Sequence, residues 1–412
     1  MTTHLSGRGR LHSLLARRAP IGLQVSGRWI KAIQLRPAKR PGQPPTIVAS
    51  ARLAKQAAAP DAAAAPGLLP AHITASDAVT LAGVLERHGF AGRRVVLVAP
   101  RDTLLTEVLE LPPRSSGAPI EQLARVELAR VSRCEPDSFE LGTWDLPTSS
   151  ASGPQPVFAV GMPHAKSEPL VATLESAGLE VVAIDTPGCS LARACGPLLA
   201  RPALSTATGG LLNAVLDVGW NTTLLVAVFC GPATGGHGVV VYERSIMESG
   251  LRRLFESLQS RLGLEPGGAE VLLDTNDPAS QDGADPRSAL RKEARLCMGE
   301  YFEAIAPEVQ RSLAYLSHRY QGWAPGRLLL TGDGAELAIG EDIQARVAAA
   351  VSMPVIRVAA TDIAAARTSP TSRPGFMASH MAAAGASLHG FEHAAAAPVE
   401  QAESIPARRA AA

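Results

Sequence analysis

Short apolar runs alternate with amphipathic segments along most of the chain. Apolar residues recur every three or four positions in the amphipathic segments, as in 251–262 and 302–320, and this is the spacing of a helix packed on one face. The runs between them have the length of buried strands. They lie at 21–25, 30–35, 95–99, 179–185, 215–218, 224–229 and 327–330. This alternation predicts an α/β protein.

One arrangement occurs once in each half of the chain. Two apolar strands flank a short turn of small and polar residues, which is 26–29 in the first half and 219–223 in the second. Such turns present backbone N–H groups and hydroxyls that can hold an anion where no bulky side chain blocks its approach. The repetition predicts two lobes of related structure.

Changes in composition set the expected boundaries. Residues 1–18 are basic, and residues 361–412 are rich in Ala, Pro and Ser, so both segments are predicted to be disordered tails. Between them we expect a first lobe at 19–205, with a small inserted subdomain at about 100–165. A second lobe is expected at 206–360, with a subdomain inserted at about 246–325.

Length and charge narrow the class of protein. A chain of 412 residues favours two domains, and a net charge of +1 argues against a nucleic-acid partner. The five cysteines are scattered without metal-ligand spacing, which indicates free thiols in a reducing compartment. No apolar run has the length of a signal peptide or of a membrane-spanning helix, so we expect a cytoplasmic protein.

Six segments in order resemble the actin-like ATPase superfamily, and within it the PilM-like type IV pilus assembly proteins and the related cytoplasmic part of GspL secretion proteins. The segments are 21–31, 109–112, 177–185, 216–223, 307–313 and 330–337. The resemblance implies a two-lobed actin-like (ribonuclease H-like) duplicated α/β domain with a small inserted subdomain. It also implies a site for ATP and Mg²⁺ between the lobes.

The resemblance assigns residues to that nucleotide site by position. Asp217 is the implied Mg²⁺ contact, and no catalytic residue is identified. The nucleotide-binding residues that it implies are Ser26, Gly27, Lys31, Asp217, Gly219, Thr222, Thr223, Gly332 and Gly334.

Several positions depart from the family pattern. Gln24 stands where an acidic residue usually helps to manage Mg²⁺, and an uncharged amide does this poorly. Asp333 replaces a glycine in the adenosine-contacting turn, and 248–250 keeps one glycine of a usual pair. We hypothesise that ATP turnover is lost or very slow and that nucleotide affinity is weak. A working ATPase that tolerates these changes is the competing interpretation.

The resemblance implies a scaffold rather than a metabolic enzyme. PilM-like proteins dock the cytoplasmic tail of a bitopic inner-membrane partner, which is PilN in that system, and are held at the membrane through it. The groove expected here involves the inserted subdomain, roughly 100–133. The alternative is an active actin-like ATPase of the FtsA cell-division type, although 382–412 lacks the apolar residues of an amphipathic membrane anchor. A sugar kinase would need a carboxylate base, and none is marked in the sequence.

Overall fold

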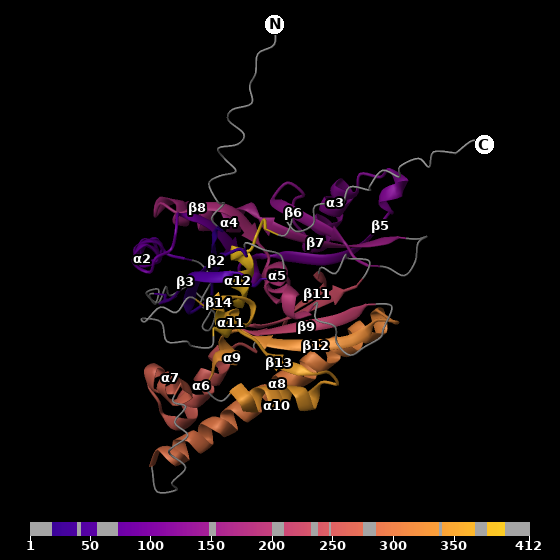
Figure 1. The fold of residues 1–412 in the computed structure, drawn as a ribbon. Helices are drawn as coiled ribbons and strands as arrows, with labels where there is room; N and C mark the ends of the chain where they lie inside the picture. The colour runs from indigo at the N-terminus through magenta and orange to yellow at the C-terminus, as the bar shows by residue number, and fades with distance from the viewer. Residues whose placement is uncertain are drawn as a thin grey trace, which may run out of the picture.

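The first lobe is built on a six-stranded sheet. The computed structural model (Figure 1) describes residues 19–38, 43–55, 73–147, 154–199, 210–231, 238–246, 249–274, 286–337, 340–366 and 377–391. The strand order is β14-β3-β2-β1-β4-β8, in which β1 and β2 form the first hairpin and β4 runs parallel to β1. The strands are β1 (Ile21–Val25), β2 (Trp29–Arg36), β3 (Thr46–Ala54), β4 (Arg94–Val98), β8 (Glu180–Asp185) and β14 (Ala365–Ala366).

Helices cover both faces of this sheet. Thr74 caps α2 through a reciprocal capping box with Asp77, and Gly178, at a φ of 78°, follows the end of α4. Both helices pack on one face, and α5 packs on the other. These helices are α2 (Ala75–Arg87), α4 (His164–Ser176) and α5 (Pro187–Leu199).

The second lobe repeats the hairpin at the centre of a five-stranded sheet of order β11-β10-β9-β12-β13. Every residue of β10 is buried, because α5 lies on one face of the sheet and α6, α8 and α10 lie on the other. The strands are β9 (Leu211–Val218), β10 (Thr223–Cys230), β11 (Gly238–Ile246), β12 (Ala324–Thr331) and β13 (Val355–Arg357). The helices are α6 (Leu251–Leu262), α7 (Pro266–Asp274), α8 (Pro286–Arg319), α9 (Asp333–Glu336) and α10 (Gly340–Ala350).

A third, three-stranded sheet of order β5-β7-β6 is inserted between β4 and β8. Helix α3 (Ile120–Ser132) packs on one face of it, and the other face shares an apolar core with the second lobe. Trp144 stacks on Phe158, with ring centroids 4.7 Å apart, and its Nε1 donates a hydrogen bond to the Val240 carbonyl oxygen of β11. The remaining elements are β5 (Leu105–Leu111), β6 (Phe139–Asp145), β7 (Gln155–Pro163), η1 (Arg101–Thr103) and η2 (Arg114–Ser116).

The end of the described chain returns to the first lobe. The prediction of a disordered tail over 361–412 is wrong for 361–366 and 377–391, which contain α11 (Ala360–Ile363), β14, η4 (Ala378–His380) and α12 (Met381–Ser387). All seven residues of α12 are buried against β1 and α5. A Cβ on Gly22 would lie 2.6 Å from the Ser387 nitrogen, and one on Gly385 would lie 2.5 Å from the Ser190 carbonyl carbon. The absence of side chains at both glycines therefore permits this close packing.

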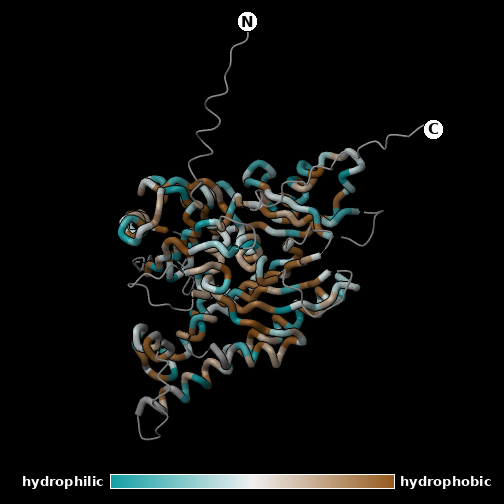
Figure 2. Tube along the Cα trace, viewed as in Figure 1, coloured by the Kyte–Doolittle hydropathy of each residue, from teal (hydrophilic) through white to brown (hydrophobic). Residues whose placement is uncertain are grey.

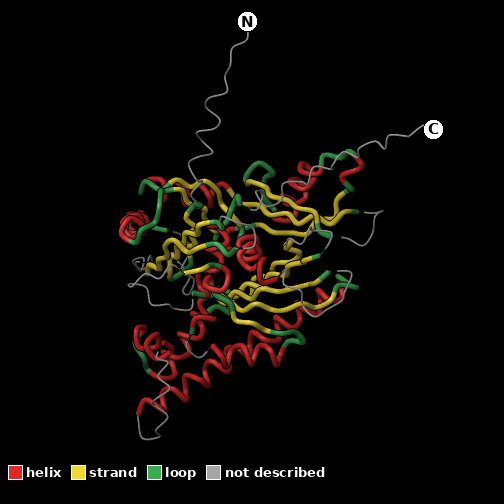
Figure 3. The backbone as a smooth tube through the Cα atoms, in the orientation of Figure 1, coloured by secondary structure: helices red, strands yellow, loops and turns green. Residues whose placement is uncertain are grey.

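Helix bounds in the second lobe differ in part from the sequence pattern. The helix indicated by the apolar spacing at 302–320 begins earlier, since α8 has 34 residues and contains Pro307, and the turn after β12 is followed by two helices, α9 and α10. The expected tail at 1–18 lies outside the described residues. Apolar positions concentrate in the three sheets (Figure 2), and helices flank them (Figure 3). Within the part of the chain that is described, no helix is long and apolar enough to cross a membrane.

Candidate functional site

Three turns from the two lobes meet at the edge where the sheets face each other. The β1–β2 turn contributes Gly27, and the β9–β10 turn contributes Asn221, whose side-chain oxygen would lie 2.6 Å from a Cβ on Gly27. The turn after β12 packs on the end of β9, because a Cβ on Gly334 would lie 2.5 Å from Val218 Cγ1. The segments that carry the expected nucleotide site are thus neighbours in space.

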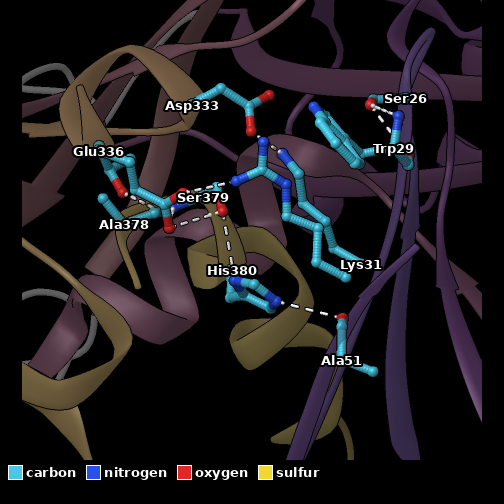
Figure 4. A network of polar contacts seen from close by, with 11 residues as sticks. Ser26, Trp29, Lys31, Ala51, Asp333, Glu336, Ala378, Ser379 and His380 are labelled. Atoms are coloured by element: carbon cyan, nitrogen blue, oxygen red, sulfur yellow. Dashed lines mark hydrogen bonds and ion pairs between the residues drawn. The ribbon is translucent and has the colours of Figure 1, made fainter. Parts of the chain in front are cut away.

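The two lobes are joined at this point by a buried ion pair. Lys31 projects from β2, and its Nζ lies 2.7 Å from Asp333 Oδ1 at the start of α9 (Figure 4). The side chains are 2% and 5% exposed. Asp333 has no hydrogen-bond partner on either carboxylate oxygen, so the Lys31 ammonium is its compensating contact. Removing either partner would leave an uncompensated charge in the interior.

Asp217, at the end of β9, adds a second carboxyl group. The residue is half-buried. Burial raises the pKa of Asp217 to about 6; Lys31 opposes this rise and Asp333 adds to it. Gly332, at a φ of 90°, brings its backbone against this carboxyl group. The Lys31 ammonium therefore forms an ion pair with Asp333 and also acts on the charge of Asp217.

A second group of contacts surrounds the ion pair. Arg52 Nη1 lies 3.1 Å from Glu336 Oε2, and Glu336 Oε1 accepts hydrogen bonds from the Ser379 backbone N–H and hydroxyl group. His380 Nε2 donates to the Ala51 carbonyl oxygen, and Nδ1 lies 3.2 Å from Ser379 Oγ. Burial, with a further contribution from Lys31, lowers the pKa of His380 to about 4, so its imidazole is neutral at pH 7.

Arg28, in the β1–β2 turn, reaches toward aromatic rings of both lobes. Its guanidinium carbon lies 5.1 Å from the ring centroid of Trp29 and 4.6 Å from that of Trp220. Phe255 of α6 contributes a third ring at 5.3 Å. Cation–π attraction of this kind adds a further link between the lobes.

Several predicted site residues use their polar groups within their own turns. Ser26 Oγ accepts from the Trp29 N–H and donates to the Trp29 carbonyl oxygen, and the Gly219 N–H donates to the Thr222 carbonyl oxygen. Thr223 is buried, and its hydroxyl donates to the Ser249 carbonyl oxygen at 2.7 Å. Ser26 and Thr223 therefore shape the turns, and these groups are engaged within the protein.

The arrangement does not fit the phosphates of a nucleotide. The Asn221 side chain occupies the space between the two turns, and Lys31 is already paired with Asp333. Gln24 Oε1 is buried without a hydrogen-bond partner. Among the described residues, no group of three or more His, Cys, Asp or Glu side chains is placed to hold a metal ion.

Sequence reasoning missed part of this site. Asn221 was not singled out, although it stands inside the expected turn 219–223 and is a larger polar residue than its neighbours Gly219 and Thr222. Arg52, Ser379 and His380 could not have been assigned to the site, because they reach it from β3 and from a segment expected to be disordered. Glu336 was expected only as the start of a helix.

Comparisons with known proteins place the fold. No protein-family profile matches the sequence, and no curated protein sequence matches it. A structure of the PilM–PilN type IV pilus biogenesis complex matches 90% of this chain and 98% of its own chain, at 17% identity and a TM-score of 0.64. The ethanolamine utilization protein EutJ from Carboxydothermus hydrogenoformans matches at 14% identity, over 91% of each chain, with a TM-score of 0.46. The cytoplasmic domain of EpsL from Vibrio cholerae matches 60% of this chain and 77% of its own, at 12% identity and a TM-score of 0.32.

The first of these matches carries the conclusion about architecture. The chain has the two-lobed actin-like fold of PilM, with mixed sheets in both lobes and a small inserted sheet. The fold expected from the sequence is confirmed, as is the resemblance to PilM.

Proposed function

We propose that this chain is a cytoplasmic, actin-like scaffold of a type IV pilus or a related envelope-spanning assembly. In this role it docks the cytoplasmic tail of a bitopic, PilN-like inner-membrane protein and is held at the membrane through that partner. The carrying observation is the match to the PilM–PilN complex, which extends over 98% of the PilM-like chain. One fold supports many functions, so a docking surface and the state of the nucleotide site must be argued separately.

The inserted subdomain offers sheet edges to an extended peptide. In its sheet β7 is central, and β5 and β6 each pair with it on one side. Among the described residues, no further strand pairs with the outer edge of either. An exposed edge presents backbone N–H and C=O groups that an added strand can satisfy.

Helix α3, which packs against β5, carries exposed apolar residues. Val126 is 53% exposed and Val131 is 45% exposed, whereas Ala124 and Leu128 face the core. The side chains of a docked tail would cover these valines and gain the free energy of removing apolar surface from water. The docking surface is therefore proposed to comprise the β5 edge and the exposed valines of α3.

The nucleotide site is proposed to be degenerate. Lys31 is committed to Asp333, and Asn221 fills the space between the turns, so these groups oppose rather than assist phosphate binding. We propose weak or absent ATP and Mg²⁺ binding and no efficient ATPase activity.

A pull-down of tagged, full-length protein from gently solubilised native cells tests the scaffold role. Recovery of a small bitopic inner-membrane protein, together with pilus or secretion components, is the expected result. Recovery of division-ring proteins, with ATP-dependent filaments in electron micrographs, would replace the scaffold by the FtsA-type alternative.

Titration with a synthetic peptide of the recovered partner's cytoplasmic tail tests the docking surface. We expect Val126→Glu with Val131→Glu to weaken binding at least about tenfold, because two buried contacts are replaced by charges. Val79→Glu, on α2, is the matched control, since Val79 is 65% exposed and lies away from the inserted sheet. Equal binding by all three proteins would refute this surface.

A further inference from the structure

We infer that Asp333 acts as an internal substitute for a phosphate group: its carboxylate occupies the Lys31 ammonium and holds the two lobes closed without a ligand. This inference rests on the proposed degenerate nucleotide site and names the residue responsible for it. A phosphate-bearing ligand would bind only by displacing Asp333 from Lys31.

The ion pair has the chemistry of a phosphate contact. An ammonium group attracts a phosphate oxygen and a carboxylate oxygen alike, and the distance of 2.7 Å between Lys31 Nζ and Asp333 Oδ1 is that of a direct ion pair. Because Lys31 is 2% exposed, its ammonium group is not free to turn toward solvent and bind a second anion there. The carboxylate and an entering phosphate would therefore compete for one cation.

The surrounding charges favour the internal anion over an external one. Asp217 lies against Gly332, the residue before Asp333, and adds a second carboxyl group whose charge Lys31 influences. Glu336, on α9 with Asp333, is already balanced by Arg52 on β3, and His380 from η4 is neutral. A phosphate group entering here would meet Asp217 and the displaced Asp333 without a spare buried cation among these groups.

Other side-chain contacts also hold the two lobes together. The cationic side chains come from the first lobe and their acceptors from the second: Arg52 contacts Glu336, and Arg28 contacts the rings of Trp220 and Phe255. Asn221 of the second lobe fits against Gly27 of the first. The closed arrangement is thus satisfied by side chains of the chain itself.

Calorimetric titration of the full chain with Mg-ATP tests this inference. Wild-type protein should bind weakly, and Asp333→Gly should bind at least about tenfold more tightly, because Lys31 becomes available and a negative charge is lost. Adding Lys31→Met to Asp333→Gly should abolish the gain. Glu86→Gln is the control, because it removes an exposed carboxylate that pairs with Arg93 at the opposite end of the first-lobe sheet, and it should leave affinity within about twofold of wild type.

Equal affinity of wild type and Asp333→Gly, or a gain that persists without Lys31, would overturn the inference. Asp333→Asn provides a second variant should the glycine variant fail to fold, because the amide keeps the volume and can still accept a hydrogen bond from Lys31. It should also gain affinity relative to wild type. Binding of the partner's tail should be the same in all these variants. A measurement of tail binding therefore tests the scaffold role separately from this inference.

Hydrogen exchange on the unaltered protein gives an independent result. Residues 26–31 and 332–336 should be protected without nucleotide, and addition of Mg-ATP should change their exchange little. Fast exchange that is suppressed by Mg-ATP would show that the lobes close on a ligand, and it would overturn the inference.

Discussion

The seating of α12 on α5 leads to the sharpest stability prediction. Gly385→Ala places a Cβ 2.5 Å from the Ser190 carbonyl carbon and into overlap with its oxygen. Ordinary contact begins at 3.4 Å, so α12 must retreat by roughly 1 Å or more, and the atoms that it meets belong to helical backbone that cannot rotate away. Overpacking of a core costs about 1–3 kcal/mol, and contact with backbone belongs at the upper end, so we expect a loss of about 3 kcal/mol.

Urea unfolding of the full chain, followed by far-UV circular dichroism and tryptophan fluorescence, measures this loss. Gly83→Ala is the matched control, because Gly83 lies within α2 and its added Cβ would meet no atom within 4 Å. The control should be neutral or more stable by up to about 1 kcal/mol, since alanine favours a helix over glycine. Equal midpoints for wild type and Gly385→Ala would refute the close packing of α12 on α5.

Three further predictions concern buried polar groups. The pKa of His380 is about 4 in the folded state and about 6.5 in the unfolded state, so the unfolded state binds an extra proton between these values. The free energy of unfolding should therefore fall by up to roughly 3 kcal/mol as pH falls from about 6.5 to 4. His380→Gln should reduce this loss in urea titrations at several pH values, and an unchanged pH dependence would contradict the prediction. Arg101→Met removes the ion-pair partner that lies 2.9 Å from the buried Glu243 carboxylate, so the free energy of unfolding should fall by about 3–5 kcal/mol. Adding Glu243→Gln should restore part of this stability. A double variant no more stable than Arg101→Met would argue against a stabilising role for the pair. Trp144→Phe keeps an aromatic ring but loses the hydrogen bond to the Val240 carbonyl oxygen, so thermal unfolding should show a loss of stability of about 1 kcal/mol. An unchanged stability would mean that this hydrogen bond does not stabilise the interface.

The elements that the sequence predicted well are those with strong local contrast. The hairpin β1–β2, strand β10 and helix α6 appear within one or two residues of their expected positions, whereas β9 begins four residues before the expected 215–218. Their apolar residues recur with the period of a strand or helix, so the pattern is readable without knowledge of the partners. The inserted sheet was anticipated by resemblance more than by its own pattern.

The C-terminal segment was missed for a physical reason. Helix α12 is mostly alanine and is buried all round, so it shows neither an apolar stripe nor a polar face. Its burial depends on glycine and small residues in β1 and α5, which lie far away in the sequence. Complementarity of this kind belongs to the folded surface, and composition alone favours disorder.

The candidate site was predicted in its backbone but not in its side-chain partners. The resemblance assigned Lys31, Asp217 and Gly332 to one site. In the structure Gly332 lies against Asp217, and Lys31 pairs with Asp333, the residue after Gly332. The pairing of Lys31 with Asp333 depends on how the two lobes meet, and no local pattern encodes that distance.

The return of α12 to the first lobe has a consequence for how the protein is made. Ser387 Oγ donates to the Pro20 carbonyl oxygen and accepts from the Leu35 N–H, so these groups acquire their partner only after residue 387 has left the ribosome. At about 5–20 residues per second, synthesis of the intervening chain takes roughly 20–70 s, during which the face of β1 that α12 will cover is bare. The first lobe to be translated is thus among the last parts to be completed. We expect chaperones to bind the uncovered face of its sheet while translation proceeds.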